Sequence, residues 1–345
     1  MRDSKLRFGV LGAGRIGKIH IDNLVNRVPG TEVVALSDVL PEELAKVAAR
    51  FNIAETYADY KQVLARPDVD AVVICASTNA HYQMILDAAA AGKNIFCEKP
   101  LDLAISRIQE IIARVQACGV QLMVGFNRRY DPNFHKIRET VKSGRIGQPQ
   151  VLKITSRDPA PPPEAYIRVS GGIFLDMTIH DFDMARYQMG SEVTEVYARA
   201  AVLVDPVFQQ CGDWDTALVT LTFANGGLGI IDNSRKAVYG YDQRVEVFGS
   251  EGMVEVSNNF PDSHVCFDRT GTHSSLPLNF FMDRYLESYL KEMQAFVEAV
   301  RTQQAVPVGG HDGLMAVVIG LAATKSAREN RAVKLSEILD GRRPQ

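Results

Sequence analysis

Asp176 and His180 stand four residues apart in a segment whose pattern predicts a helix. On a helix, that spacing places both side chains on one face within contact distance. An imidazole that a carboxylate orients and keeps basic can take the proton of an alcohol. Two alternatives remain open: Asp176 could cap a helix beside an incidental histidine, or the pair could share a metal ion. Asp181 and Asp183 are candidate third ligands, but neither shares that helical face, so we predict that no metal is bound.

Lys99 is a third candidate for chemistry, because it directly follows the apolar segment 94–98, a predicted strand. A lysine ammonium at the end of such a strand can donate to a substrate oxygen or polarise it, and partial burial moves its pKa towards the working range. The alternative is an exposed lysine at a strand end. The neighbouring Glu98 and Pro100 leave both interpretations open.

The elements that would position these residues begin at a glycine-rich turn near the N-terminus. An apolar run leads into G-x-G-x-x-G, formed by Gly12, Gly14 and Gly17, with Arg15 and Ile16 completing the loop. The first glycine would allow a sharp turn, the second the approach of a pyrophosphate, and the third close packing of helix on strand. The phosphates would lie on free N–H groups at a helix N-terminus.

The next apolar strand, residues 32–38, ends in Asp38, about 20 residues beyond the glycines, where the ribose hydroxyls of NAD need an acceptor. The alternative role of Asp38 is a turn residue or a helix cap before Pro41. Because Val39 and Leu40 offer no cation for a 2′-phosphate, we predict NAD rather than NADP as the cofactor.

Further apolar strands at 71–76, 94–98 and 121–125 alternate with helical segments, which predicts right-handed crossovers and a doubly wound parallel sheet, a Rossmann domain. Ligands bind at the carboxyl edge of such sheets. The remaining predicted cofactor-binding residues follow strands at this edge: Ser77, Thr78, Asn79, His81, Glu98 and Lys99.

From about residue 130 the pattern changes to strands with little helix between them, predicted at 151–156, 196–204, 217–223, 228–233, 243–248 and 253–256. Apolar and polar residues alternate in 217–223, which is typical of an antiparallel sheet with one polar face. A loop at 170–172 leads into a predicted helix that runs to about Met189, and two amphipathic helices close the chain. We therefore predict a Rossmann domain at 1–126 and an α+β domain at 127–345 with a large, mostly antiparallel open sheet, whose C-terminal helices pack back on the first domain.

Composition narrows the class of protein. A chain of 345 residues exceeds the usual size of a single core, and its net charge of −3 favours neither nucleic acid nor an acidic membrane as a partner. Five scattered cysteines without C-x-x-C spacing argue against a disulfide framework, and the N-terminus lacks the pattern of a signal peptide. The longest apolar run, residues 314–323, is too short to cross a bilayer. We expect a cytoplasmic protein.

Four motifs together resemble the glucose-fructose oxidoreductase and inositol dehydrogenase family, and within it the inositol 2-dehydrogenases. They are the glycine-rich turn, Glu98-Lys99-Pro100, the segment GFNRRYDP at 125–132 and the segment GGIFLDMTIHD at 171–181. The resemblance spans essentially the whole chain. It implies an NAD-dependent enzyme that oxidises a secondary hydroxyl of a cyclic polyol, myo-inositol at carbon 2 above all, and that assembles as a dimer or tetramer.

The resemblance also implies residue roles: Lys99 as the catalytic lysine, Asp176 as the carboxylate that pairs with the substrate and the histidine, and His180 as the base. Positions similar to substrate-pocket residues are Arg128, Asp158 and Tyr241. One departure is Asp158, where some inositol dehydrogenases carry asparagine; a carboxylate only accepts hydrogen bonds, which bears on the choice of polyol. The alternatives are a scyllo-inositol or sugar dehydrogenase of the same family and, in another class, a non-catalytic NAD-binding regulator.

Overall fold

The computed structural model describes residues 5–339 of the chain. Two compact units are present: the first comprises the chain up to Tyr130 together with Glu287–Met315, and the second comprises Asp131–Leu286 together with the chain from Ala316 onward. The predicted division at 126/127 remains an interpretation of the sequence. Within residues 5–339, every helix is either too short or too polar to traverse a lipid bilayer.

The first unit is built on a six-stranded parallel sheet in the order β3-β2-β1-β4-β5-β6. This doubly wound order confirms the predicted Rossmann fold. The strand β4 is buried at every residue, as expected of a strand covered on both faces. The strands are β1 Leu6–Leu11, β2 Thr31–Ser37, β3 Thr56–Tyr57, β4 Ala71–Ile74, β5 Asn94–Glu98 and β6 Leu122–Gly125.

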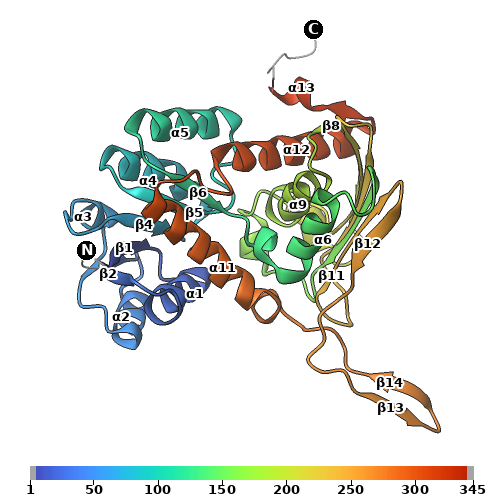
Figure 1. Cartoon of the computed structure of the whole chain (residues 1–345), viewed down its shortest axis with the longest axis horizontal. Coiled ribbons are helices and arrows are strands. Elements are labelled where there is room, and N and C mark those ends of the chain that lie inside the picture. Colours follow the sequence, from blue (N-terminus) through green and yellow to red (C-terminus); the bar gives the residue numbers. More distant parts are fainter. Residues whose placement is uncertain (1–4, 340–345) are drawn as a thin grey trace. The chain divides into compact units, whose positions relative to one another are not determined.

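Helices that follow these strands cover the sheet of the first unit (Figure 1). They are α1 Arg15–Asp22, η1 Asn23–Arg27, α2 Pro41–Phe51, α3 Tyr60–Leu64, α4 Thr78–Ala90, α5 Ile105–Cys118 and η2 Asn127–Tyr130. The long helix α11, Phe281–Thr302, adds a late segment to the same core: the Phe296 ring lies 6.2 Å from that of Phe8 and 5.8 Å from that of Phe96.

The second unit is built on a seven-stranded mixed sheet in the order β12-β11-β7-β10-β9-β8-β15. Only β10 and β7 pair in parallel; the other pairs are antiparallel, as predicted. In β9, Ala217, Val219 and Leu221 are buried whereas Leu218 and Thr220 are exposed, so the sheet has one covered and one open face. The strands are β7 Pro149–Arg157, β8 Val193–Ala201, β9 Thr216–Phe223, β10 Leu228–Ser234, β11 Asp242–Gly249, β12 Gly252–Val256 and β15 Val333–Lys334.

Two features of the second unit differ from the sequence prediction. A hairpin of β13 Val265–Asp268 and β14 Gly271–Ser274, absent from the prediction, projects beyond the sheet (Figure 1). The predicted helix up to Met189 is divided into α8 Ile173–Asp176 and α9 Ile179–Met189. The other helices are α6 Pro132–Lys142, α7 Glu164–Ile167, α10 Val207–Gln210, α12 Gly310–Glu329, which begins in the range of the first unit, and α13 Leu335–Leu339.

The break between α8 and α9 has a local cause. The backbone N–H of Thr178 donates to the carbonyl oxygen of Ile173 at 2.9 Å, and the Thr178 hydroxyl oxygen lies 3.1 Å from the same oxygen. This bond from residue i to i−5 takes the place of the regular i−4 bond, so regular α-helical bonding ends with the N–H of Met177. The single predicted helix was therefore wrong at this point, while the helical segments on either side were right.

Candidate active site

The glycine-rich loop between β1 and α1 is shaped by its three glycines. Gly12 has φ +110°, and a Cβ there would lie 2.7 Å from the carbonyl carbon of Cys75. A Cβ at Gly17 would collide with the carbonyl oxygen of Gly12. In contrast, no atom lies within 4 Å of a Cβ built at Gly14, the residue that precedes α1. Gly14 thus leaves room for a phosphate group to approach the backbone where α1 begins with Arg15 and Ile16.

Asp38 directly follows β2 and is bonded to this loop. Its Oδ2 accepts a hydrogen bond from the backbone N–H of Ala13 at 2.6 Å, and its Oδ1 accepts one from Leu40 N–H at 2.8 Å. The carboxylate is partly exposed. Since each carboxylate oxygen has a second lone pair, Asp38 can hold the loop and also accept from ribose hydroxyls. Both predicted roles of Asp38, the turn residue and the ribose acceptor, are therefore compatible in one geometry.

The loops at the carboxyl edge of the sheet are connected by His81. Its ring is buried, with Nδ1 2.8 Å from the carbonyl oxygen of Pro100 and Nε2 3.0 Å from that of Ala76. Burial lowers the pKa of His81, so the ring is neutral and donates from one nitrogen only. The structure thus gives His81 a positioning role between the loop after β4 and the segment after Lys99. In the loop after β4, the hydroxyl of Ser77 donates to Asn79 Oδ1 at 2.6 Å, and Thr78 begins α4.

Glu98, the residue before Lys99, belongs to a buried group that sequence reasoning missed. The carboxylate Oε1 lies 2.8 Å from Nε2 of His20 in α1, and both His20 and Glu292 of α11 have no exposed surface. Burial, and then the charge of Glu98, raise the pKa of Glu292 well above its usual range. Ligand-type atoms of the three side chains lie within 4.8 Å of one another. The His20–Glu98 hydrogen bond holds two of these side chains together, and the Glu292 carboxyl lies beside them.

In the second unit, Asp176 ends α8 and His180 lies in the first turn of α9. Asp176 is buried and accepts two hydrogen bonds: from the Tyr166 hydroxyl to Oδ1 at 2.7 Å and from Arg235 Nη2 to Oδ2 at 2.8 Å. Burial and the negative charge of Asp176 raise the pKa of Tyr166, so the phenol stays protonated and donates. His180 is partly exposed. Its pairing with Asp176 remains a prediction.

Arg235 also binds the carboxylate of Asp158, from Nη1 to Oδ2 at 3.2 Å. Asp158 follows β7, and Arg235 follows β10, which is the parallel neighbour of β7. The structure therefore brings the predicted residues Asp158 and Asp176 to one guanidinium. Sequence reasoning missed Arg235 because no spacing distinguishes it from the adjacent Lys236.

A buried amide fixes the start of α9 to the sheet. Asn233 of β10 donates to Asp181 Oδ2 at 2.9 Å and accepts from the hydroxyl of Thr178 at 2.7 Å. At the other end, Asp213 Oδ1 accepts from the backbone N–H of Ile173, the first residue of α8, at 3.0 Å. These bonds hold both short helices in place, and Asp181, a candidate metal ligand in the sequence, is bonded to an amide instead.

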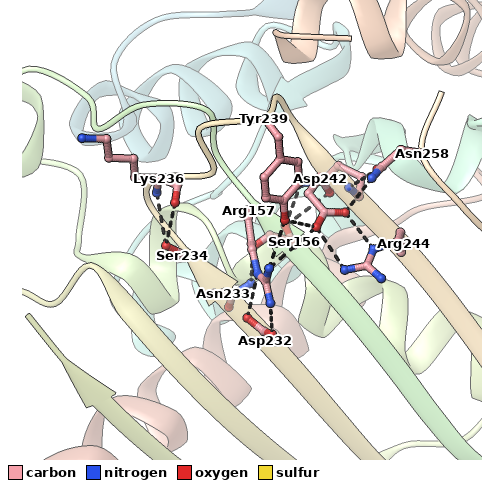
Figure 2. Close-up of polar contacts among 11 residues, drawn as sticks. Ser156, Arg157, Asp232, Asn233, Ser234, Lys236, Tyr239, Asp242, Arg244 and Asn258 are labelled. Carbon is pink, nitrogen blue, oxygen red and sulfur yellow. Dashed lines mark hydrogen bonds and ion pairs between the residues drawn. The ribbon is translucent and has the colours of Figure 1, made fainter. Parts of the chain in front are cut away.

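Figure 2 shows the polar network that anchors the loop from β10 to β11. Arg157 donates from Nε to Asp232 Oδ1 at 3.1 Å and from Nη1 to the Tyr239 hydroxyl at 3.0 Å, and that hydroxyl donates to Asp242 Oδ2 at 2.6 Å. Burial alone would raise the pKa of Asp242, but hydrogen bonds from Arg244, Tyr239 and Asn258 outweigh it and lower that pKa. The anchored loop carries the predicted substrate residue Tyr241, whose buried ring packs edge-on against that of Tyr285 with centroids 6.0 Å apart.

Comparisons with known proteins agree with this geometry. Residues 6–126 match the model of the oxidoreductase family with an NAD-binding Rossmann fold, and residues 134–255 match the GFO/IDH/MocA C-terminal domain. The chain is 49% identical to the myo-inositol 2-dehydrogenase of Thermotoga maritima across 97% of this chain and 100% of that protein. The chain belongs to the GFO/IDH/MocA family.

Solved structures of other GFO/IDH/MocA proteins extend the likeness to nearly the whole fold. The myo-inositol dehydrogenase of Corynebacterium glutamicum superposes with a TM-score of 0.92 at 38% identity, covering 96% of this chain and 99% of that one. The scyllo-inositol dehydrogenase of Lactobacillus casei, solved with NAD(H) and scyllo-inositol bound, gives 0.90 at 28% identity with the same coverage. The predicted family is confirmed.

NAD is the cofactor of this GFO/IDH/MocA chain, as predicted. The open space at Gly14, the helix N-terminus beyond it and the acceptor Asp38 fit that dinucleotide.

Some of the predicted substrate residues belong to the first unit and the others to the second. Lys99, partly buried, and Arg128, buried in η2, belong to the first unit, whereas the second unit holds Asp158, Asp176, His180 and Tyr241.

Proposed function

We propose that this protein is an NAD-dependent inositol 2-dehydrogenase that oxidises the hydroxyl at carbon 2 of myo-inositol to a ketone. The observation that carries the proposal is the bonding of Asp176: a buried carboxylate that accepts hydrogen bonds from Arg235 and Tyr166, four residues before the partly exposed His180. An ionised carboxylate beside an imidazole favours general-base chemistry on an alcohol. The near full-length relationship to the Thermotoga maritima enzyme supports the same substrate.

In the proposed reaction, His180 accepts the hydroxyl proton, and the negative charge of Asp176 stabilises the imidazolium that forms. Lys99 donates a hydrogen bond to the same oxygen, which favours the alkoxide-like transition state. NAD, when bound, supplies the acceptor for the hydride. Asp158, Arg128 and Tyr241 bind the remaining hydroxyls, so the chain provides both the base and the groups that orient the ring.

Asp158 supports a second candidate substrate, scyllo-inositol, which the Lactobacillus casei structure contains. A carboxylate only accepts hydrogen bonds, whereas the asparagine found in some inositol dehydrogenases both donates and accepts. The orientation of one hydroxyl can therefore decide which isomer binds more tightly. We keep myo-inositol as the main proposal because of the higher identity to the Thermotoga maritima protein.

We further propose that the protein self-associates through the open face of the second unit's sheet. Large apolar side chains are exposed on β9, β10, β11 and β12: Leu218, Leu228, Ile230, Phe248 and Met253. Large apolar side chains exposed on one face of a sheet mark an interaction site.

All five cysteines are free, which supports a reducing compartment such as the cytoplasm.

The test of the substrate is NADH formation across a panel of inositol isomers and hexoses at matched concentrations. The proposal predicts the highest kcat/KM for myo-inositol, with scyllo-inositol the next best. A preference for a hexose would contradict the inositol assignment. Tight NAD binding with turnover of none of the polyols would favour the non-catalytic regulator instead.

A further inference from the structure

Arg235 is a buried cation shared by two predicted substrate residues. Its side chain is 5% exposed, and its guanidinium donates to Asp176 Oδ2 at 2.8 Å and to Asp158 Oδ2 at 3.2 Å. The two carboxylates come from different elements, the end of α8 and the segment after β7. A planar guanidinium has five donors in a fixed arrangement, so one arginine can set the spacing of two carboxylates.

We propose that Arg235 is a positioning residue that holds Asp158 and Asp176 as a fixed pair of ionised acceptors for two hydroxyls of the polyol. The inference rests on the proposed function, because paired acceptors at a set spacing recognise vicinal hydroxyls. Arg235 itself need not touch the substrate. Its effect is on the protonation and the orientation of the two carboxylates that do.

The charges around Arg235 show why the pair needs it. Two carboxylates that contact one guanidinium repel each other, and the positive charge between them favours the ionised form of both. Burial would lower the pKa of Arg235, but the charges of Asp176 and Asp158 outweigh this and raise it, so the guanidinium stays charged. Tyr166 and Asp213 also face this group: Tyr166 donates to Asp176, and burial raises the pKa of Asp213.

The backbone around Arg235 is held independently of its side chain. The N–H of Arg235 donates to the carbonyl of Asp215 at 2.8 Å. The N–H of Ala237 donates to the carbonyl of Asp158 at 2.7 Å, and the N–H of Asp158 donates to the carbonyl of Ser234 at 2.9 Å. Replacing the side chain therefore removes the charge bridge while these backbone bonds remain, which makes Arg235 a suitable position for substitution.

The kinetic test compares wild type with Arg235→Met, Arg235→Lys and the double variant Asp158→Asn/Arg235→Met. Arg235→Met should lower kcat/KM for myo-inositol by about 10²-fold, because it removes the cation that both carboxylates contact. It should also move the acidic limb of the pH profile to higher pH, because the loss of a neighbouring positive charge raises the pKa of a carboxyl group. The double variant Asp158→Asn/Arg235→Met, which also lacks the Asp158 charge, should have a kcat/KM about tenfold higher than that of Arg235→Met. Its acidic limb should lie at the same pH as that of wild type. Arg235→Lys keeps the positive charge but lacks the planar guanidinium whose two nitrogens contact the two carboxylates. Its acidic limb should therefore match that of wild type, while its kcat/KM should lie between those of Arg235→Met and wild type.

Lys236→Met is the matched control, because it removes a neighbouring positive charge whose side chain is exposed and extends away from the network (Figure 2). Its kcat/KM and acidic limb should stay within about twofold of wild type. A purely structural role of Arg235 predicts loss of activity without a shift of the acidic limb and without recovery in the double variant. The proposal would therefore be overturned if the acidic limb of Arg235→Met were unchanged, or if the double variant had no higher kcat/KM than Arg235→Met.

A second measurement needs no substrate and separates this proposal from the proposed function. With Arg235 gone, the carboxylate pair has a raised folded-state pKa, so stability is lost as pH rises from about 4 upward. Denaturant unfolding should therefore show a larger penalty for Arg235→Met at about pH 8 than at about pH 5, and the double variant should remove this difference. An equal penalty at both pH values would refute the charge-bridge role. If wild type oxidises no polyol but Arg235→Met still shows the pH-dependent loss of stability, the proposed function is wrong and the charge-bridge role of Arg235 is supported.

Discussion

At the residue scale, each functional side chain has a second task in the fold. Asp38 holds the glycine-rich loop through Ala13 as well as offering an acceptor to the ribose. Asp176 is fixed by Tyr166 and Arg235. A residue whose geometry is locked by such bonds loses little entropy when it binds a ligand. Substitutions at these positions therefore change both binding and local order, and matched controls are needed to separate the two effects.

Asp38→Ser should narrow the preference for NAD over NADP, because it removes the charge that repels a 2′-phosphate. The ratio of kcat/KM for the two cofactors measures this. Asp59→Ser is the control: Asp59 likewise accepts from a backbone N–H, that of Lys61 at 2.9 Å, but outside the glycine-rich loop. Its cofactor ratio should equal that of wild type. An unchanged ratio in Asp38→Ser, or a wild type that prefers NADP, would contradict the assigned role.

His180→Ala should lower kcat by roughly 10²–10⁴-fold, the usual contribution of a positioned acid or base. Polyol oxidation by wild type should fall as pH drops and the histidine becomes protonated, because the base must be neutral to accept a proton. The variant should lose this acidic limb and keep its affinity for NAD, which the first unit binds. Near-normal kcat with an intact limb would remove His180 from the mechanism and leave Lys99 as the base.

At the element scale, the sequence predicted strands better than their connections. The apolar runs of β1, β4 and β5 identify buried parallel strands, and alternation identifies β9. The division between α8 and α9 depends on Thr178 and on the amide of Asn233, more than 50 residues later, so no local pattern reveals it. Arg235 and the His20–Glu98–Glu292 group were missed for the same reason: their partners are distant in sequence.

Glu292 of α11 lies close to Glu98 of β5 in the first unit. Its raised pKa makes the free energy of unfolding depend on pH. A carboxyl whose folded pKa exceeds its unfolded value contributes stability at low pH, and this is lost as pH rises through the folded pKa. Glu292→Gln should therefore gain stability relative to wild type as pH rises from about 5 to about 8. Denaturant unfolding measures the gain. Glu298→Gln, on an exposed position of the same helix, should show none, and a pH-independent effect of Glu292→Gln would contradict the raised pKa.

At the scale of the whole molecule, the open face of the seven-stranded sheet predicts self-association. Light scattering should give a mass at least twice the 38.0 kDa of one chain. Ile230→Lys places a charge on the exposed side of β10, so it should weaken the assembly while leaving the covered face unchanged. A monomeric wild type at micromolar concentration would exclude this interface, as would an Ile230→Lys variant that assembles with unaltered affinity.

Isotopic labelling tests whether the protein transfers hydride from carbon 2 of myo-inositol to NAD. The enzyme is supplied with NAD and myo-inositol that carries deuterium on carbon 2, and the NADH formed is analysed by mass spectrometry. We expect one deuterium in each NADH and a slower hydride-transfer step than with unlabelled substrate. Unlabelled NADH from this substrate would show oxidation at another carbon, and no NADH at all would contradict the assigned activity.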